Sequence, residues 1–84
     1  MPIFMDVHEN LPAGATAADV AQAHAADLAK QDTYGVKYLK YWVDEKEHKA
    51  FCLVDAPDAE TAARVHREAH GLVADRIFEV VEGV

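Results

Sequence analysis

The feature that most constrains the fold is the order in which the spacing of apolar residues changes along the chain. Apolar and polar side chains alternate over residues 1–8, which predicts a strand. Thr16-Ala17-Ala18-Asp19 then has the S/T-x-x-D/E pattern of a helix start, and this helix is expected to end near Lys30. Two runs rich in aromatic and β-branched residues follow at 36–43 and 48–54, and they predict a pair of strands joined by an acidic turn.

The second half of the chain continues with a helix and a strand. Pro57 is expected in the first turn of a helix that extends to about His70, Gly71 is expected just beyond its end, and residues 77–82 predict a last strand. The order strand, helix, strand, strand, helix, strand is that of the ferredoxin-like βαββαβ fold. This α+β fold has two helices on one face of a four-stranded antiparallel sheet. We therefore expect a single ferredoxin-like domain over residues 1–84.

The small size of the chain indicates that a partner helps to stabilise it. A domain of 84 residues buries only about 60% of the surface that its unfolded chain exposes, and its core supplies roughly 3–5 kcal/mol unaided. If Ile3, Met5 and Val7 meet the helices, the opposite sheet face needs cover. We predict a homodimer in which a second copy covers that face. Its uncovered residues would be Phe4, Ala50, Cys52 and Val54, and its interface anchors Tyr38, Tyr41 and Trp42.

The charge of the chain excludes some classes of partner. Fifteen acidic residues against eight lysines and arginines give a formal net charge of −7, which repels phosphate backbones, and we expect no nucleic-acid partner. We expect no membrane partner either. The first residues lack the basic start and apolar core of a secretory signal, and Cys52 is the single cysteine, so a cytoplasmic location is predicted. Glycine-rich phosphate loops, CxxC pairs and serine-hydrolase elbows are absent from the sequence.

Five histidines in an acidic chain favour divalent cations. His66 and His70 are four residues apart on a predicted helix, a spacing at which two imidazoles can ligate one ion. Arg67 stands where a zinc protease has its general-base glutamate, so protease chemistry is excluded. The pair could instead be capping or surface histidines. The predicted core stripe of the second helix places His66 at its flank and His70 toward solvent, which would suit that alternative. This stripe comprises Ala62, Val65, Ala69 and Leu72.

The other histidines have similar alternatives. His24 belongs to the predicted apolar stripe of the first helix, from which it could converge with His66 and Asp27 or simply be a core histidine bonded to a carbonyl. His8 shares a strand face with Asp6 and could hold an ion there or lie at a solvated strand end. His48 is expected at the surface and Cys52 as a buried, inert thiol. The remaining stripe residues of the first helix are Ala17, Val20, Ala21 and Leu28.

The chain resembles a family of small, single-domain bacterial nickel-binding proteins with a ferredoxin-like fold, formerly described as a domain of unknown function. The resemblance implies a dimer with surface nickel sites and a role in sequestering the metal. The β-turn at Glu47-His48 departs from the family pattern, in which a glycine is expected. The matching segments are Met5-Asp6-Val7-His8, the His24 and Asp27 pair, Tyr41-Trp42-Val43-Asp44-Glu45, Phe51-Cys52-Leu53-Val54-Asp55-Ala56-Pro57 and Val65-His66-Arg67-Glu68-Ala69-His70-Gly71.

Our main hypothesis is a non-enzymatic metal-binding homodimer for nickel sequestration or homeostasis, with His8, His24, His66 and His70 as the ligands of Ni²⁺. Imidazole and carboxylate donors also accept other divalent transition metals, since Cu²⁺ binds such sets more tightly and Zn²⁺ comparably. The alternative is a small-molecule enzyme of the dimeric α+β-barrel type, in which His24, His66 and Cys52 line a cavity. A third possibility is a structural or interaction module in which the histidines have no role.

Overall fold

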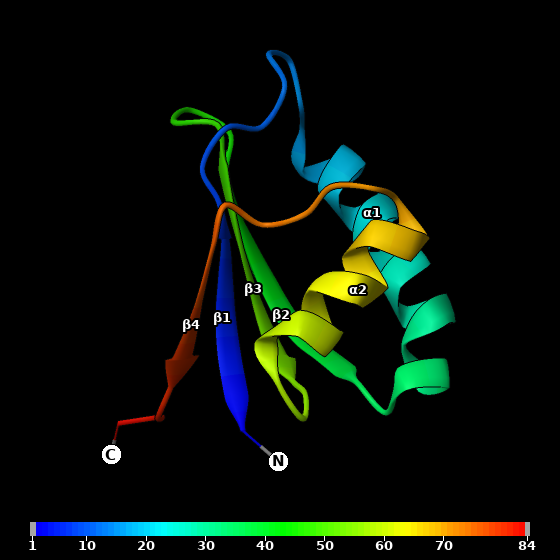
Figure 1. Ribbon diagram of the computed structural model, residues 1–84. Coiled ribbons are helices and arrows are strands. Elements are labelled where there is room, and N and C mark those ends of the chain that lie inside the picture. The colour runs from blue at the N-terminus through cyan, green and yellow to red at the C-terminus, as the bar shows by residue number, and fades with distance from the viewer. Residues whose placement is uncertain (1, 84) are drawn as a thin grey trace.

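The computed structural model describes residues 2–83 and has the predicted order of elements (Figure 1). The ferredoxin-like fold is confirmed, and the predicted boundaries are correct to within about two residues. The first strand was predicted from Met1, which lies outside the described residues. The elements are β1 (Ile3–His8), α1 (Ala17–Lys30), a 3-10 turn η1 (Gln31–Tyr34), β2 (Lys37–Asp44), β3 (Lys49–Asp55), α2 (Ala59–Ala69) and β4 (Arg76–Val80).

The four strands form one antiparallel sheet in the order β2-β3-β1-β4, so β1 and β3 are its central strands. Both helices lie on the same side of this sheet, and its other side is bare in the isolated chain (Figure 1). Any side chain of β1 or β3 that points toward the helices is therefore covered from above and from both sides.

Local interactions fix the ends of the helices. At the start of α1, the Thr16 side chain accepts a hydrogen bond from the Asp19 N–H, and Asp19 Oδ2 accepts one from the Thr16 N–H at 2.9 Å, which confirms the predicted capping box. Asp58 caps α2 through the Thr61 N–H at 2.7 Å, so Pro57 precedes the cap and is outside the first turn. Gly71 follows α2 with φ of +79°, a conformation that favours glycine.

The expected orientation of the sheet is wrong. Phe4, Cys52 and Val54 belong to the core beneath the helices, and Ala50 is buried with them. Ile3, Met5 and Val7 lie on the opposite face, where each is only half-buried. Alternation divides a strand into two faces but does not say which face meets the helices. The polar residues of β1 made its buried face resemble the solvent face.

The aromatic residues of β2 were also misplaced. Tyr38 is buried in the core, and the half-buried Tyr41 packs against it, so neither residue is available as an interface anchor. A register shift between Tyr38 and Lys40 sets Leu39 aside as an extra residue, which brings two tyrosines three positions apart onto one face. Trp42 pairs with Phe51 on the bare face and is 48% exposed.

The predicted helix stripes are confirmed for Ala62 and Val65, which are buried, and are wrong at other positions. In α1 the buried residue is Asp27, whereas Leu28 is 44% exposed. In α2 His66 is buried and Leu72, beyond the helix, is 48% exposed. Hydropathy alone places Asp27 and His66 outside the apolar stripes of their helices. Both side chains point inward because each pairs with a side chain of opposite charge. The buried residues of α2 are Ala62, Ala63, Val65 and His66.

The turn between β2 and β3 contains His48, where the resemblance led us to expect a glycine. His48 is exposed there, as expected, and has φ of +58°, in the left-handed region that a glycine adopts without strain. Its carbonyl oxygen accepts a hydrogen bond from the Leu11 N–H at 2.9 Å.

Among residues 2–83, no helix combines the length and the apolar composition needed to cross a membrane.

Candidate metal centre

His66 lies at the centre of a buried polar cluster beneath the helices. Its Nδ1 is 2.8 Å from Asp27 Oδ1 on α1, and its Nε2 is 2.8 Å from Asp6 Oδ2 on β1. All three residues are at most 1% exposed. The predicted convergence of His66 with Asp27 is therefore confirmed, and the expectation that His66 lies at the flank of α2 is wrong.

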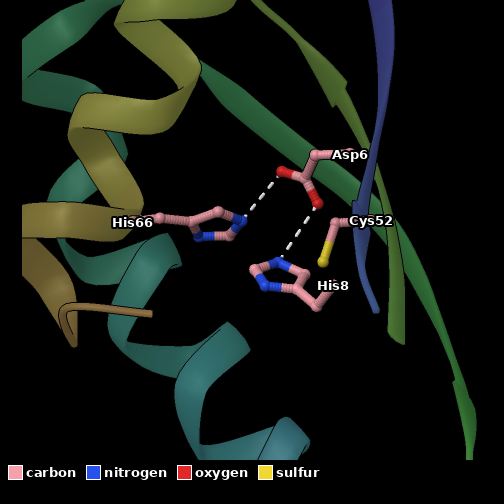
Figure 2. Close-up of side chains that lie close together, drawn as sticks. All are labelled: Asp6, His8, Cys52 and His66. Carbon is pink, nitrogen blue, oxygen red and sulfur yellow. Dashed lines mark hydrogen bonds and ion pairs between the residues drawn. The ribbon is translucent and has the colours of Figure 1, made fainter. Parts of the chain in front are cut away.

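One group of possible metal ligands surrounds Nε2 of His66. This inner group consists of Asp6, His8, Cys52 and His66 (Figure 2), whose ligand atoms all lie within 4.8 Å of one another. Asp6 and His8 share the buried face of β1, and Cys52 is the residue of β3 directly opposite Asp6. His8 Nε2 lies 3.3 Å from Asp6 Oδ1, so the predicted pairing of this carboxylate and imidazole is confirmed, in the interior of the fold.

A second group surrounds Nδ1 of His66. This outer group consists of Asp27, His66 and His70, with His70 Nε2 3.1 Å from Asp27 Oδ1 and 3.2 Å from His66 Nδ1. The Leu72 N–H donates to His70 Nδ1 at 3.1 Å, so this nitrogen is an acceptor and a neutral His70 carries its proton on Nε2. The side chain of His70 is 13% exposed and does not point freely into solvent, contrary to expectation.

The two carboxylates hold His66 as a cation. Burial alone would lower the pKa of His66, but its hydrogen bonds to Asp27 and Asp6 outweigh burial and raise the pKa to about 11. Burial likewise would raise the pKa of Asp6, yet hydrogen bonds from His66 and His8 lower it to about 2. The pKa of Asp27 is lowered against the effect of burial by His66 and His70. The cluster is therefore an imidazolium between two carboxylates.

Two further groups complete the cluster. The Tyr38 hydroxyl donates to the Ala62 carbonyl oxygen at 2.8 Å and lies 3.3 Å from Asp6 Oδ2. Burial and the charge of Asp6 raise the pKa of Tyr38 well above its usual range, so this hydroxyl keeps its proton. Burial also raises the pKa of Cys52, to about 11, against the effect of His66. As predicted, no feature of the metal-free cluster activates this thiol as a nucleophile.

A cavity of about 290 Å³ opens onto the cluster. His24 lines it, packs against Tyr41 with 4.6 Å between ring centroids, and belongs to neither ligand group. Its buried Nδ1 has no hydrogen-bond partner among residues 2–83. The cavity also contacts Cys52 and His66, so the three residues expected around a cavity do line one. The other lining residues include Leu11, Val20, Ala23, Ala50, Asp27, His8, His70 and Leu72.

The fold thus brings together three of the four predicted ligands, His8, His66 and His70, and leaves His24 apart. Sequence reasoning missed Cys52 as a member of the cluster and Tyr38 as its neighbour. The signal for Cys52 was available, because in a ferredoxin-like sheet the first and third strands are adjacent and their residues face one another. The signal for Tyr38 was hidden by the irregular register of β2.

Comparison with known proteins identifies the family and supports the fold. The family model described as nickel responsive protein, SCO4226-like, matches residues 4–80. The crystal structure of SCO4226 from Streptomyces coelicolor A3(2) superposes with a TM-score of 0.89 at 39% sequence identity, covering 98% of this chain and 99% of that chain. A search of curated proteins gives no match.

The buried charges predict how stability depends on pH. In the His66→Gln variant Asp6 and Asp27 lose their cation, and we expect the free energy of unfolding at pH 7 to fall by about 3 kcal/mol. Because the pKa of His66 is raised on folding, its contribution is complete below pH 6.5 and disappears as the pH rises through about 11. Because the pKa of Asp6 is lowered, its contribution disappears as the pH falls from 3.8 through about 2.

Urea unfolding of both proteins across this pH range measures the effect. The difference in the free energy of unfolding between wild type and His66→Gln is expected to become smaller toward both the acidic and the alkaline end of the range. His48→Gln is the matched control because His48 is exposed. A difference that stays constant between pH 7 and pH 10.5 would show that His66 is not held as a cation.

Proposed function

The chain belongs to the SCO4226-like family of nickel responsive proteins, and we propose that it binds Ni²⁺ through Asp27, His66 and His70 to sequester the metal or control its level. The observation that carries this proposal is the spacing of the outer group, in which the three ligand atoms lie 2.8, 3.1 and 3.2 Å apart. A cytoplasmic location forms part of the proposal, because the single cysteine is unpaired and buried.

The spacing suits an ion with ligands at right angles. Neighbouring donors at about 2.1 Å from such an ion are roughly 3.0 Å apart, whereas those of a tetrahedral ion are roughly 3.4 Å apart. Imidazole nitrogen and carboxylate oxygen are donors that Ni²⁺ accepts, and its geometry with them is commonly tetragonal. The three donors of the outer group would occupy three adjacent coordination positions of the ion. The adjoining cavity leaves room for water molecules at the remaining coordination positions.

Binding requires a rearrangement of protons within the group. His66 must release to solvent the proton on Nδ1, which forms the hydrogen bond to Asp27 in the absence of the ion. His70 must present a lone pair at Nε2, so its remaining proton moves to Nδ1. The Leu72 N–H, whose bond to His70 is exposed, then bonds to water at a cost of about 1 kcal/mol. Asp27 remains ionised throughout and offsets part of the charge of the metal.

The affinity for nickel should depend on His70. We expect His70→Ala to weaken Ni²⁺ binding at least about tenfold, since even the loss of a supporting hydrogen bond to a ligand has an effect of this order. Asp27→Asn should act in the same direction. Isothermal titration calorimetry of tag-free protein at pH 7.5 measures both affinity and stoichiometry.

Two other histidine variants are the controls. His48→Ala removes an exposed imidazole outside the cluster, and His24→Ala removes one that lines the cavity without belonging to the outer group. Both are expected to bind Ni²⁺ as the wild type does. Unchanged affinity in His70→Ala would remove this site from consideration, and weakened affinity in His24→Ala would restore His24 to the ligand set.

We also propose that the protein is a homodimer joined through the bare face of the sheet. Cross-strand pairing places Trp42 beside Phe51 toward one edge of this face and Met5 beside Phe78 toward the other, and Lys40 and Arg76 lie on the same face. Trp42 and Phe78 lie on the two edge strands, β2 and β4, and are 48% and 46% exposed in the isolated chain. A second copy would bury this face. The remaining apolar residues of the face are Ile3, Val7, Leu53 and Val80.

A carboxylate in place of the Phe78 ring should separate the subunits. Light scattering at micromolar concentration is expected to give twice the 9.2 kDa chain mass for the wild type and the single-chain mass for Phe78→Glu. Val81→Glu is the matched control, because Val81 follows β4 and is already 93% exposed. A monomeric wild type would contradict the proposed dimer.

The cavity supports a second candidate function, in which the protein binds or transforms a small apolar molecule. The specific observation is the buried Nδ1 of His24, which lacks a partner among residues 2–83 and lies beside the cavity together with Cys52 and His66. A buried polar atom without a partner costs about 1–3 kcal/mol, and a ligand hydroxyl could supply the missing hydrogen bond.

A monocyclic phenol such as p-cresol is a suitable probe because it joins an apolar ring to one hydroxyl. At millimolar concentration it should shift the amide resonances of Ala23, His24 and Ala50, and Ala23→Leu, which fills part of the cavity, should abolish the shifts. Nickel affinity should be the same in this variant. Absence of any shift in the wild type would argue against this second function.

A further inference from the structure

We propose that the inner group is a second metal site that takes a divalent ion accepting thiolate, such as Zn²⁺ or Co²⁺, and that it competes with the outer nickel site for His66. The inner group contributes one sulfur, two imidazoles and one carboxylate, from Cys52, His8, His66 and Asp6. The competition rests on the proposed nickel site, whereas the existence of the inner site does not.

The inner group has the number, type and spacing of donors that a four-coordinate metal site needs. Its donors come from three elements that the fold holds rigidly together: β1, β3 and α2 (Figure 2). All four ligand atoms lie within 4.8 Å of one another, and His8 Nε2 is already 3.3 Å from Asp6 Oδ1. The ligands of a tetrahedral zinc ion are roughly 3.4–3.8 Å apart, so small side-chain movements suffice.

Charge balance favours a thiolate-bound ion in this buried position. A divalent cation, the Asp6 carboxylate and a Cys52 thiolate sum to zero, and because the ion takes the place of two protons, the charge of the whole buried cluster, with Asp27 included, does not change. The ion replaces two protons, one from the Cys52 thiol and one from His66 Nε2. Both protons leave to solvent, and the ion enters through the cavity that Cys52, His8 and His66 line.

The surroundings of the inner group also suit a metal. With Nε2 of His66 on the ion, Nδ1 keeps its proton and donates it to Asp27 at 2.8 Å. This carboxylate, histidine and metal arrangement orients the imidazole and increases its strength as a ligand. Asp27 thus acts as a direct ligand in the outer site and as a supporting hydrogen-bond acceptor for the inner one.

The shared histidine makes the two sites mutually exclusive. A neutral imidazole has one lone pair, so His66 can bind an ion through Nε2 or through Nδ1, and the other nitrogen carries the proton. The inner ion leaves the outer site with Asp27 and His70 alone. The two groups therefore hold one ion between them at a time, and a thiolate-accepting metal in the inner group displaces nickel from the outer one.

Cobalt gives a direct spectroscopic test for the inner site. Titration of the reduced, metal-free wild type with Co²⁺ should produce a thiolate-to-cobalt charge-transfer band in the near ultraviolet and intense visible bands of tetrahedral Co²⁺. Cys52→Ser should lose the charge-transfer band, whereas His70→Ala, which lacks only an outer ligand, should keep it. If the wild type binds Co²⁺ without this band, or binds none, the inner site does not exist.

Two measurements on the wild type do not depend on any variant folding. Calorimetric titration with Zn²⁺ in buffers of different ionisation enthalpy should show release of about two protons per ion near pH 7.5. When zinc fills nine-tenths of the inner sites, the apparent affinity for Ni²⁺ should fall about tenfold, because one site in ten remains competent. Release of no protons would overturn the inner site, and an unchanged nickel affinity would overturn the competition.

The outcomes separate the two proposals. Nickel binding that depends on His70, together with no charge-transfer band, would leave the outer site standing and refute the inner one. A charge-transfer band without nickel binding would support the inner site and refute the outer one.

Discussion

The structure depends on one buried imidazolium held between two carboxylates. His66 on α2 reaches Asp6 on β1 with one ring nitrogen and Asp27 on α1 with the other, both at 2.8 Å. Each charge would be costly alone in the interior, and each is compensated by the others. The same contacts link both helices to the central strand of the sheet, so this interaction fixes the rotation of α1 and α2 about their own axes.

That arrangement explains why the aliphatic side of β1 is not the one beneath the helices. The covered face includes Asp6 and His8 because their partners are there, and the aliphatic residues of β1 are displaced to the bare face. Part of the small interior is thus occupied by polar groups, which contribute conformational specificity more than burial of apolar area. In the proposed homodimer, burial of the bare face against a partner would compensate for this loss, with Trp42 and Phe78 at the interface.

The same cluster connects the fold with metal chemistry. Every nitrogen and oxygen that now shares a proton with His66 is also a donor for a divalent ion, and the family to which the chain belongs is nickel responsive. The shared protons hold these side chains in place, so the proposed site would be organised before an ion arrives. Because the side chains come from β1, α1, β3 and α2, which are far apart in sequence, the cluster assembles only when the fold is complete.

The sequence by itself determined the order of the elements, the capping box at Thr16, the pairing of Asp6 with His8 and the i, i+4 spacing of His66 and His70, since these depend on neighbours within a few residues. The tertiary structure alone decided which sheet face meets the helices, that Cys52 lies opposite Asp6, that Tyr38 is turned inward by a bulge, and that His24 stays outside the ligand groups. Periodicity defines two faces of each element but not which of them is buried. That choice was made by the pairing of Asp27 and Asp6 with a histidine 39 and 60 residues away along the chain.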